Sequence, residues 1–170
     1  TPGMMEFEDI KIQLIDTPPL APYSIEFWLP HLLRRADALL LVVDLGVPPR
    51  AQMAELVAQL QKMRIGISSE SEEVLSQKKV LIVGNKLDVE NAGQNYTALQ
   101  SEYGQQLPVI AVSAKNKSGL AELKIKIFQL LDVIRVYTKA PGQKPDLTDP
   151  MVLPRGSTLE MAAAAVHKDF

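Results

Sequence analysis

The sequence contains no cysteine, so it can form neither disulfide bonds nor cysteine-ligated metal sites, as fits a cytoplasmic protein. It also lacks any apolar run of the roughly 18 residues that a membrane-spanning helix needs. The formal net charge is only −2 over 170 residues, so the total charge favours neither nucleic acid nor a membrane as partner. Hydrophobic residues make up 46% of the chain, which is enough for a sizeable core.

Short, wholly apolar segments alternate with segments whose apolar residues recur at helical spacing. Because helices on both faces of a parallel sheet bury its strands, this alternation predicts an α/β protein with a doubly wound, mostly parallel sheet. Strands are expected at 38–43, 80–84 and 109–112. Helices are expected at 25–33, 53–63, 96–103 and 120–134. Ser118 is the expected N-cap of the last helix, a hairpin is expected over 4–15, and a surface loop over 68–79.

After about Arg135 the pattern changes. A strand at 136–138, a loop rich in Pro, Gly and Asp at 139–150 and a strand at 151–153 are expected. Ser157 and Glu160 have the spacing of a capping box, with Ser157 as the cap of an Ala-rich helix. This stretch predicts the start of a second, small α+β unit that is too short to close a core by itself.

The tetrapeptide Asn85-Lys86-Leu87-Asp88 directly follows the apolar strand expected at 80–84. Open α/β sheets bind ligands beyond the carboxyl ends of their strands. Guanine offers two adjacent donors, the ring N–H and the exocyclic amine, and the carboxylate of Asp88 can accept both, whereas adenine lacks this pair. Asn85 can reach another ring atom or tie neighbouring loops together, and the aliphatic stem of Lys86 can cover the base plane.

A second polar motif, Ser113-Ala114-Lys115, follows the strand expected at 109–112. The backbone N–H of Ala114 is placed to donate to a purine carbonyl, which again favours guanine. Either motif alone can arise by chance. The occurrence of both motifs, each at the end of a buried strand, is not expected by chance. Asp16 is expected to leave a buried strand, the second of the hairpin, as a lone carboxylate; it is either a turn-forming residue before proline or a ligand that holds Mg²⁺ through water.

Together these motifs resemble those of translation-factor-class GTPases of the Obg–HflX branch, in the subgroup near the developmentally regulated GTP-binding proteins. Asp16-Thr17-Pro18-Pro19 resembles the third GTPase motif, D-x-x-G. Asn85-Lys86-Leu87-Asp88 matches the fourth, N-K-x-D, and Ser113-Ala114-Lys115 the fifth, S-A-K. The resemblance implies that residues 1–132 are part of a P-loop-type G domain.

The C-terminal stretch resembles the first half of a TGS domain, which has a ubiquitin-like β-grasp fold and accompanies several such GTPases. The similarity lies in Arg135-Val136-Tyr137-Thr138-Lys139 and in Leu153-Pro154-Arg155-Gly156-Ser157-Thr158. It implies a partial TGS domain over residues 133–170.

The resemblance also implies a function. GTP would be held at its guanine end by Asn85, Lys86, Asp88, Ser113, Ala114 and Lys115, and Mg²⁺ would be held by Asp16. The whole protein would hydrolyse GTP to GDP and phosphate in the cytoplasm, with the ribosome or another RNA as partner.

Three departures from the family pattern matter. The sequence has no G-x-x-x-x-G-K-[S/T] loop, which lies upstream in the family, so the chain is expected to be a fragment that binds GTP weakly or undetectably and is inactive alone. Pro19 stands where the family glycine donates an N–H to the γ-phosphate, and proline has none. Leu20 replaces a water-positioning glutamine, so no catalytic residue is assignable and slow intrinsic hydrolysis is expected.

Two other functions stay open from the sequence. In the first, the G domain is degenerate and serves as a nucleotide-independent scaffold, with the TGS-like tail recruiting RNA or the ribosome; Pro19 and Leu20 favour this interpretation. In the second, the protein is an adenine-specific ATPase. This is disfavoured because Asp88 would place an acceptor against the acceptor nitrogen of adenine.

Overall fold

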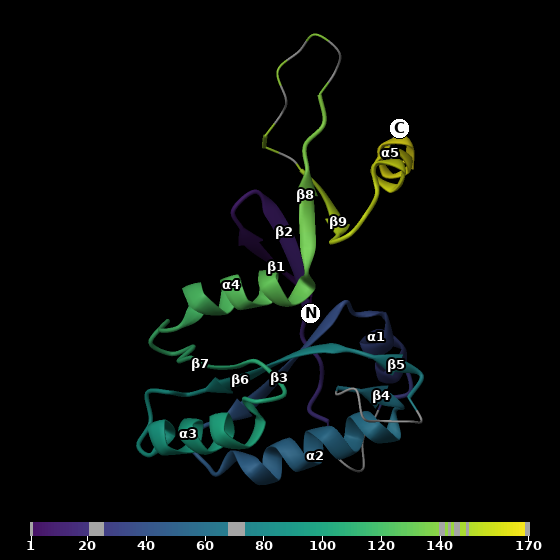
Figure 1. Ribbon diagram of the computed structural model, residues 1–170. Coiled ribbons are helices and arrows are strands. Elements are labelled where there is room, and N and C mark those ends of the chain that lie inside the picture. Colours follow the sequence, from purple (N-terminus) through teal and green to yellow (C-terminus); the bar gives the residue numbers. More distant parts are fainter. Residues whose placement is uncertain are drawn as a thin grey trace. The chain divides into compact units, whose positions relative to one another are not determined.

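The structure is a computed structural model that describes residues 2–20, 26–67, 74–139, 142, 144, 147–148 and 150–168 (Figure 1). The chain divides into two compact units, each described here by itself: Thr17–Leu130, and Thr1–Asp16 together with Leu131–Phe170. Of the helices in the described ranges, none combines the length and the apolar character that crossing a membrane requires.

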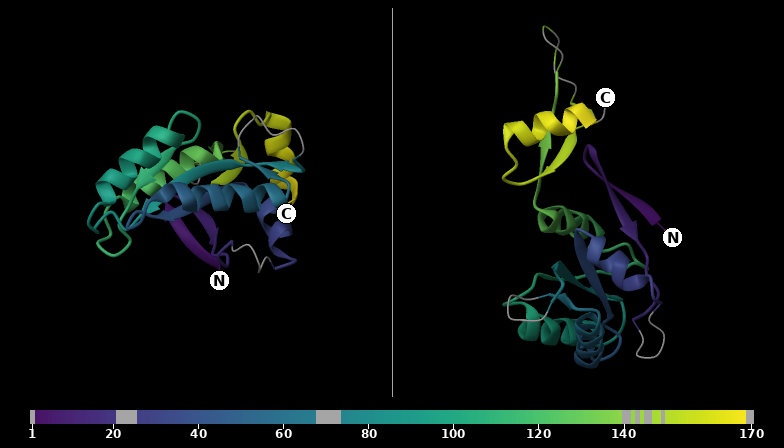
Figure 2. Two further views of the ribbon diagram at one scale, coloured as in Figure 1. Left: turned by 90° about the horizontal axis from the view of Figure 1, so that it is seen from below. Right: turned by 90° about the vertical axis from the view of Figure 1, so that its right-hand side faces the viewer.

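The larger unit is built on a parallel sheet with the strand order β3-β6-β7. These strands span Ala38–Asp44 (β3), Lys79–Asn85 (β6) and Val109–Ala111 (β7). Figures 1 and 2 show α2 and α3 on one face of the sheet and α4 on the other. The three helices span Pro49–Lys62 (α2), Ala92–Tyr103 (α3) and Leu120–Leu131 (α4). Because both faces are covered, the central strand β6 is buried from Val80 to Gly84.

The core of this unit forms between the sheet and its helices. Leu41, Val43 and Leu45 are buried, and Met53 of α2 and Leu99 of α3 pack in the same cluster. The short helix α1 (Leu29–Arg35) adds Leu29 and Leu33. The two-residue strand β5 (Ser76–Gln77) lies within the surface loop predicted over 68–79, and it pairs in parallel with β4 (Ile65–Gly66), which precedes that loop. Residues 68–73 of that predicted loop lie outside the described residues.

The other unit contains two antiparallel strand pairs and one helix. The elements are β1 (Pro2–Phe7) with β2 (Ile10–Ile15), β8 (Val133–Val136) with β9 (Met151–Pro154), and α5 (Leu159–Lys168). Arg135 of β8 joins the pairs, because its guanidinium lies 2.9 Å from the carboxylate of Asp9 and also pairs with Glu8. The hydroxyl of Tyr137 donates to Asp9 as well. This hydrogen bond and the charge of Arg135 hold the pKa of Asp9 below its ordinary value.

The three predicted strands of the sheet, the predicted hairpin and the mixed α/β class with a parallel sheet are confirmed. The units group the hairpin with the C-terminal stretch, whereas the sequence assigned it to the G domain. The division into a partial G domain over 1–132 and a partial TGS domain over 133–170 stays a prediction.

Two predictions about α4 were wrong. The helix ends at Leu131 rather than at 134, because Asp132 adopts a φ of 53° and Ile134 belongs to β8. Ser118 is not its cap, because the backbone of Ser118 pairs with Ser113 and the carbonyl of Gly119 accepts the hydrogen bond from Leu123. Helical spacing of apolar residues continued past the true end, since Ile134 of β8 is also apolar.

Two further predictions are corrected in the other unit. Thr158, not Ser157, caps α5: its hydroxyl accepts from the N–H of Met161, while the hydroxyl of Ser157 donates to Pro154. Asp16 does not leave a buried strand. Only Ile10 of β2 is buried, and Ile15 is 45% exposed. Within the described residues β2 pairs with β1 alone, so it lies in a two-stranded sheet rather than inside the larger parallel sheet.

Candidate functional site

The two motifs predicted to bind a purine lie next to each other at the carboxyl end of the parallel sheet. Asn85 ends β6, and Ser113 follows β7, its neighbour in the sheet. The loops are joined by backbone hydrogen bonds, from Leu87 N–H to the carbonyl of Val112 (2.9 Å) and from Val112 N–H to the carbonyl of Gly84 (2.8 Å). The sheet therefore brings together the residues that the sequence placed in one site.

The carboxylate of Asp88 is held beside the second motif. The hydroxyl of Ser113 donates to its Oδ1, while Lys115 Nζ lies 3.9 Å from its Oδ2. These contacts, the Ser113 hydrogen bond foremost, hold the pKa of Asp88 below its ordinary value, so it is anionic at neutral pH. The side chain is 10% exposed, and each carboxylate oxygen has two acceptor positions. Asp88 thus keeps capacity for a ligand's donors.

Ser113 is fixed before any ligand binds. The residue is 1% exposed, and its hydroxyl accepts from the N–H of Asn116 at 3.1 Å while it donates to Asp88. Its backbone also exchanges two hydrogen bonds with Ser118, of 3.0 and 3.1 Å. A hydroxyl used in both directions has a defined orientation, which in turn orients the carboxylate.

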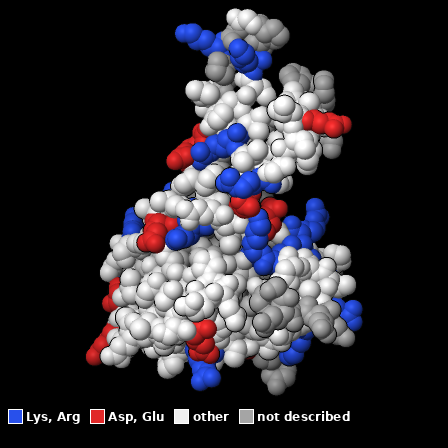
Figure 3. Space-filling view, in the orientation of Figure 1, with Lys and Arg blue, Asp and Glu red and all other residues white. Residues whose placement is uncertain are grey.

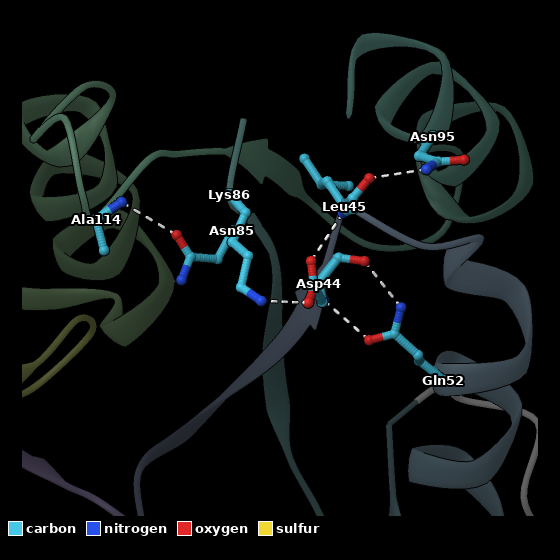
Figure 4. A network of polar contacts seen from close by, with 8 residues as sticks. Asp44, Leu45, Gln52, Asn85, Lys86, Asn95 and Ala114 are labelled. Atoms are coloured by element: carbon cyan, nitrogen blue, oxygen red, sulfur yellow. Dashed lines mark hydrogen bonds and ion pairs between the residues drawn. The ribbon is translucent and has the colours of Figure 1, made fainter. Parts of the chain in front are cut away.

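Asn85 ties the two loops together, one of the two roles predicted for it. Its Oδ1 accepts the backbone N–H of Ala114 at 3.1 Å (Figure 4). The donor that was predicted to meet a purine carbonyl is therefore paired with a side chain in this structure. A ligand carbonyl would have to replace or share the Asn85 oxygen.

Lys86 makes a contact that the sequence did not predict. Its backbone adopts a φ of 68°, and its Nζ lies 2.6 Å from Oδ2 of Asp44 at the end of β3. The signal was present, because Asp44 ends an apolar strand as Asn85 does, and residues at the carboxyl ends of neighbouring parallel strands meet. The side chain of Gln52 binds the backbone of Asp44, and that of Asn95 binds the carbonyl of Leu45. Neither contact could be predicted in this way, because Gln52 and Asn95 lie within helices and not at strand ends.

The predicted ligand of Mg²⁺, Asp16, is exposed and belongs to the other unit. Over the described ranges, no group of three or more His, Cys, Asp or Glu residues could hold a metal ion. A single carboxylate supplies too few ligands to hold Mg²⁺ without phosphate oxygens and water.

Leu20, predicted to stand where many small GTPases carry a water-positioning glutamine, packs against the hydrophobic core of the larger unit. A leucine cannot orient water by hydrogen bonding, and its partial burial adds a packing role. Lys115 is 83% exposed, so its long contact with Asp88 is a weak, screened one. The cavity of about 160 Å³ in this unit lies elsewhere, between α2, β4 and the end of α3.

The chain is similar to proteins named for GTP binding. It is 35% identical over 94 residues to an uncharacterized GTP-binding protein, MJ1326, of Methanocaldococcus jannaschii, covering 53% of this chain and 23% of that protein. It is 28% identical over 145 residues to the probable mitochondrial GTP-binding protein OBGM of Oryza sativa subsp. japonica, covering 76% and 26%. The homologues are GTP-binding proteins of the Obg and developmentally regulated families. The chain spans about a quarter of the length of these two relatives.

No protein-family model matches the chain. Among solved structures, the crystal structure of a mutation variant of SsGBP matches with a TM-score of 0.57 and 21% identity, covering 76% of this chain and 45% of that one. At this identity the likeness shows the fold alone. It is consistent with a G-domain-like arrangement of the parallel sheet and its helices.

Proposed function

We propose that this chain supplies the guanine-binding part of a GTP-binding protein. The observation that carries the proposal is the pairing of the two motifs: the anionic carboxylate of Asp88 is held by Ser113, one residue from the N–H of Ala114. The names of the homologues support the same ligand. Guanine recognition would use Asn85, Lys86, Asp88, Ser113, Ala114 and Lys115.

The chemistry of these groups favours guanine over adenine. Asp88 offers two anionic acceptors, which suit the ring N–H and the exocyclic amine of guanine. Adenine would present a ring acceptor to this carboxylate, and two acceptors repel each other. Ala114 would donate to the guanine carbonyl, which adenine lacks. Nucleotide binding would thus be selective through the base.

We extend the proposal to the whole protein as GTP hydrolysis with Mg²⁺, in which Asp16 would contact the ion through water. Leu20 supplies no polar group, so hydrolysis would need another residue, a bound cation or a partner. A TGS domain over 133–170, a cytoplasmic location and a ribosome or RNA partner belong to the same proposal. On the face seen in Figure 3, basic and acidic side chains are interspersed, and that face adds no support for RNA.

A nucleotide-independent scaffold is the second candidate. Leu20 favours it, because this residue, predicted to stand where many small GTPases carry a glutamine, packs against the core. In this function the parallel sheet would present loops to a protein or RNA partner, and the two motifs would serve only to join those loops. Such a protein would show no base-selective binding.

The test is base selectivity, measured by titrating the ¹⁵N-labelled chain with nucleotides and following amide shifts by NMR. We expect GDP to bind with a Kd on the order of millimolar, because the sequence holds no phosphate loop to add affinity. Inosine diphosphate, which lacks the exocyclic amine, and ADP should bind more weakly. Shifts should centre on residues 85–88 and 113–116. Isothermal titration that gives a micromolar or tighter Kd for GTP would contradict the expected weakness.

Asp88→Asn is the matched variant, because it keeps the side-chain shape and exchanges one acceptor for a donor. It should weaken GDP binding and favour xanthosine diphosphate, whose ring carries a carbonyl where guanine carries the amine. Lys115→Gln is the control for charge alone and should leave the order of the bases unchanged. Equal binding of GDP and ADP by the unaltered chain would refute guanine recognition and favour the scaffold.

A further inference from the structure

Asp44 uses both of its carboxylate oxygens within the larger unit. Oδ2 lies 2.6 Å from Nζ of Lys86 (Figure 4). Oδ1 accepts the N–H of Gly46 at 2.7 Å. The β3–β6 register sets Asp44 opposite Asn85, directly before Lys86. The pairing of β3 with β6 therefore places the Asp44 carboxylate next to the proposed base-binding motif.

The backbone of Asp44 is held on its other side by one side chain. The amide of Gln52 accepts from Asp44 N–H at 2.9 Å and donates to the Asp44 carbonyl at 2.9 Å. These two hydrogen bonds replace the pair that the backbone of an adjacent strand would make with Asp44 at the edge of β3. Because Gln52 lies on α2, the position of Asp44 is fixed by packed elements and depends on no ligand.

The ion pair with Asp44 fixes the conformation of the Lys86 side chain. Its Cα is fixed in a left-handed turn and its ammonium is fixed at Asp44, so the four-carbon stem is ordered between two anchors. The side chain remains 56% exposed, which leaves the stem free to meet a flat ligand. An unanchored lysine would lose its rotamer freedom at the moment of binding.

We propose that Asp44 is a positioning residue of the nucleotide site, which pre-orders the Lys86 stem as a platform for the plane of the base. This inference rests on the proposed function and deepens it. Asp44 contributes affinity without base selectivity, since its oxygens are already occupied by Lys86 and Gly46. Selectivity stays with the edge-reading group, Asp88.

The experiment is a double-mutant cycle on GDP affinity, using Asp44→Asn, Lys86→Met and both together in the full chain. Asn at position 44 keeps an acceptor for Gly46 N–H and removes the charge, while Met keeps an apolar stem without an ammonium. Asp44→Asn should raise the Kd about two- to fivefold, the range expected for an exposed ion pair. In the Lys86→Met background the same change should leave the Kd unaltered. The ratio of Kd values for GDP and inosine diphosphate should not move.

Arg50→Gln is the control, because it breaks the exposed ion pair with Glu102 in the same unit, 3.4 Å long, and should leave the Kd unchanged. An equal effect of Asp44→Asn with and without the lysine ammonium, or no effect at all, would overturn the positioning role. If the unaltered chain fails to prefer GDP over ADP, the proposed function itself fails, and this inference fails with it. Those failures are distinguishable, since only the first leaves base preference intact.

Discussion

Adding one methyl group at Gly84, directly before Asn85 of the proposed site, should destabilise the larger unit. A Cβ at this position would lie 2.8 to 2.9 Å from three side-chain carbons of Leu45, closer than real contacts allow. Leu45 is 0% exposed and cannot swing into solvent. Overpacking of this kind costs about 1–3 kcal/mol, and reduced freedom of the unfolded chain offsets up to about 1 kcal/mol. We expect Gly84→Ala to lower the free energy of unfolding by about 1–2 kcal/mol.

Urea denaturation followed by circular dichroism measures this change. With a slope of about 2 kcal/mol per molar, the midpoint should fall by about 0.5–1 M. Gly93→Ala is the matched control: within the part of the chain that the structure describes, nothing lies within 4 Å of its new Cβ, and alanine in helix α3 should stabilise the unit by up to about 1 kcal/mol. In a Leu45→Ala background the clash is gone, so Gly84→Ala should no longer destabilise. A neutral Gly84→Ala, or the same loss in both backgrounds, would refute the steric argument.

Two further predictions concern acid stability and the second loop. The ammonium of Lys86 and the N–H of Gly46 hold the pKa of Asp44 below 3.8, so its stabilising contribution is present above that pH and lost as pH falls through the folded-state pKa. Asp44→Asn should therefore flatten the decline in unfolding free energy between pH 5 and pH 2, and an unchanged acid limb would count against the ion pair. Gly119→Ala, with a φ of 74° and a new Cβ 2.7 Å from the carbonyl of Ala111, should destabilise by at least about 1 kcal/mol more than Gly142→Ala, where φ is 79° and no described residue comes within 4 Å of the new Cβ. Equal thermal unfolding midpoints for the two variants would contradict this.

The sheet was predictable because its strands carry a strong, local signal. The runs ending at Val43, Gly84 and Val112 are apolar at every position, which only strands covered on both faces require. Parallel strands with helical crossovers then place their carboxyl ends at one edge, so the meeting of Asp88 with Ser113 followed from topology alone. Element ends were less predictable, as at Ile134, because hydropathy does not distinguish a helix end from the start of an apolar strand.

The polar pairings made by Gln52, Asp44 and Arg135 were not predictable, because they depend on distances that only packing sets. Gln52 reads as one of several glutamines on an amphipathic helix, yet its amide completes the hydrogen bonds at the edge of β3. Asp44 was visible as the polar end of a strand, but its partner lies 42 residues away. The ion pair between Arg135 of β8 and Asp9 of the N-terminal hairpin joins residues that are still farther apart in the sequence, and no sequence pattern predicted it.

The hydrogen bond from Ala114 to Asn85 decides where guanine selectivity must arise at the proposed site. A guanine carbonyl that binds the Ala114 N–H would exchange one neutral acceptor for another, so the number of hydrogen bonds stays the same and the net gain is small. Adenine, which brings no carbonyl, would leave the Asn85 pairing undisturbed and lose little at this point. Asp88 differs, because its anionic oxygens gain two charge-assisted hydrogen bonds with guanine and meet an acceptor in adenine. Discrimination between the bases at the proposed site therefore falls on residue 88 rather than on the backbone amide.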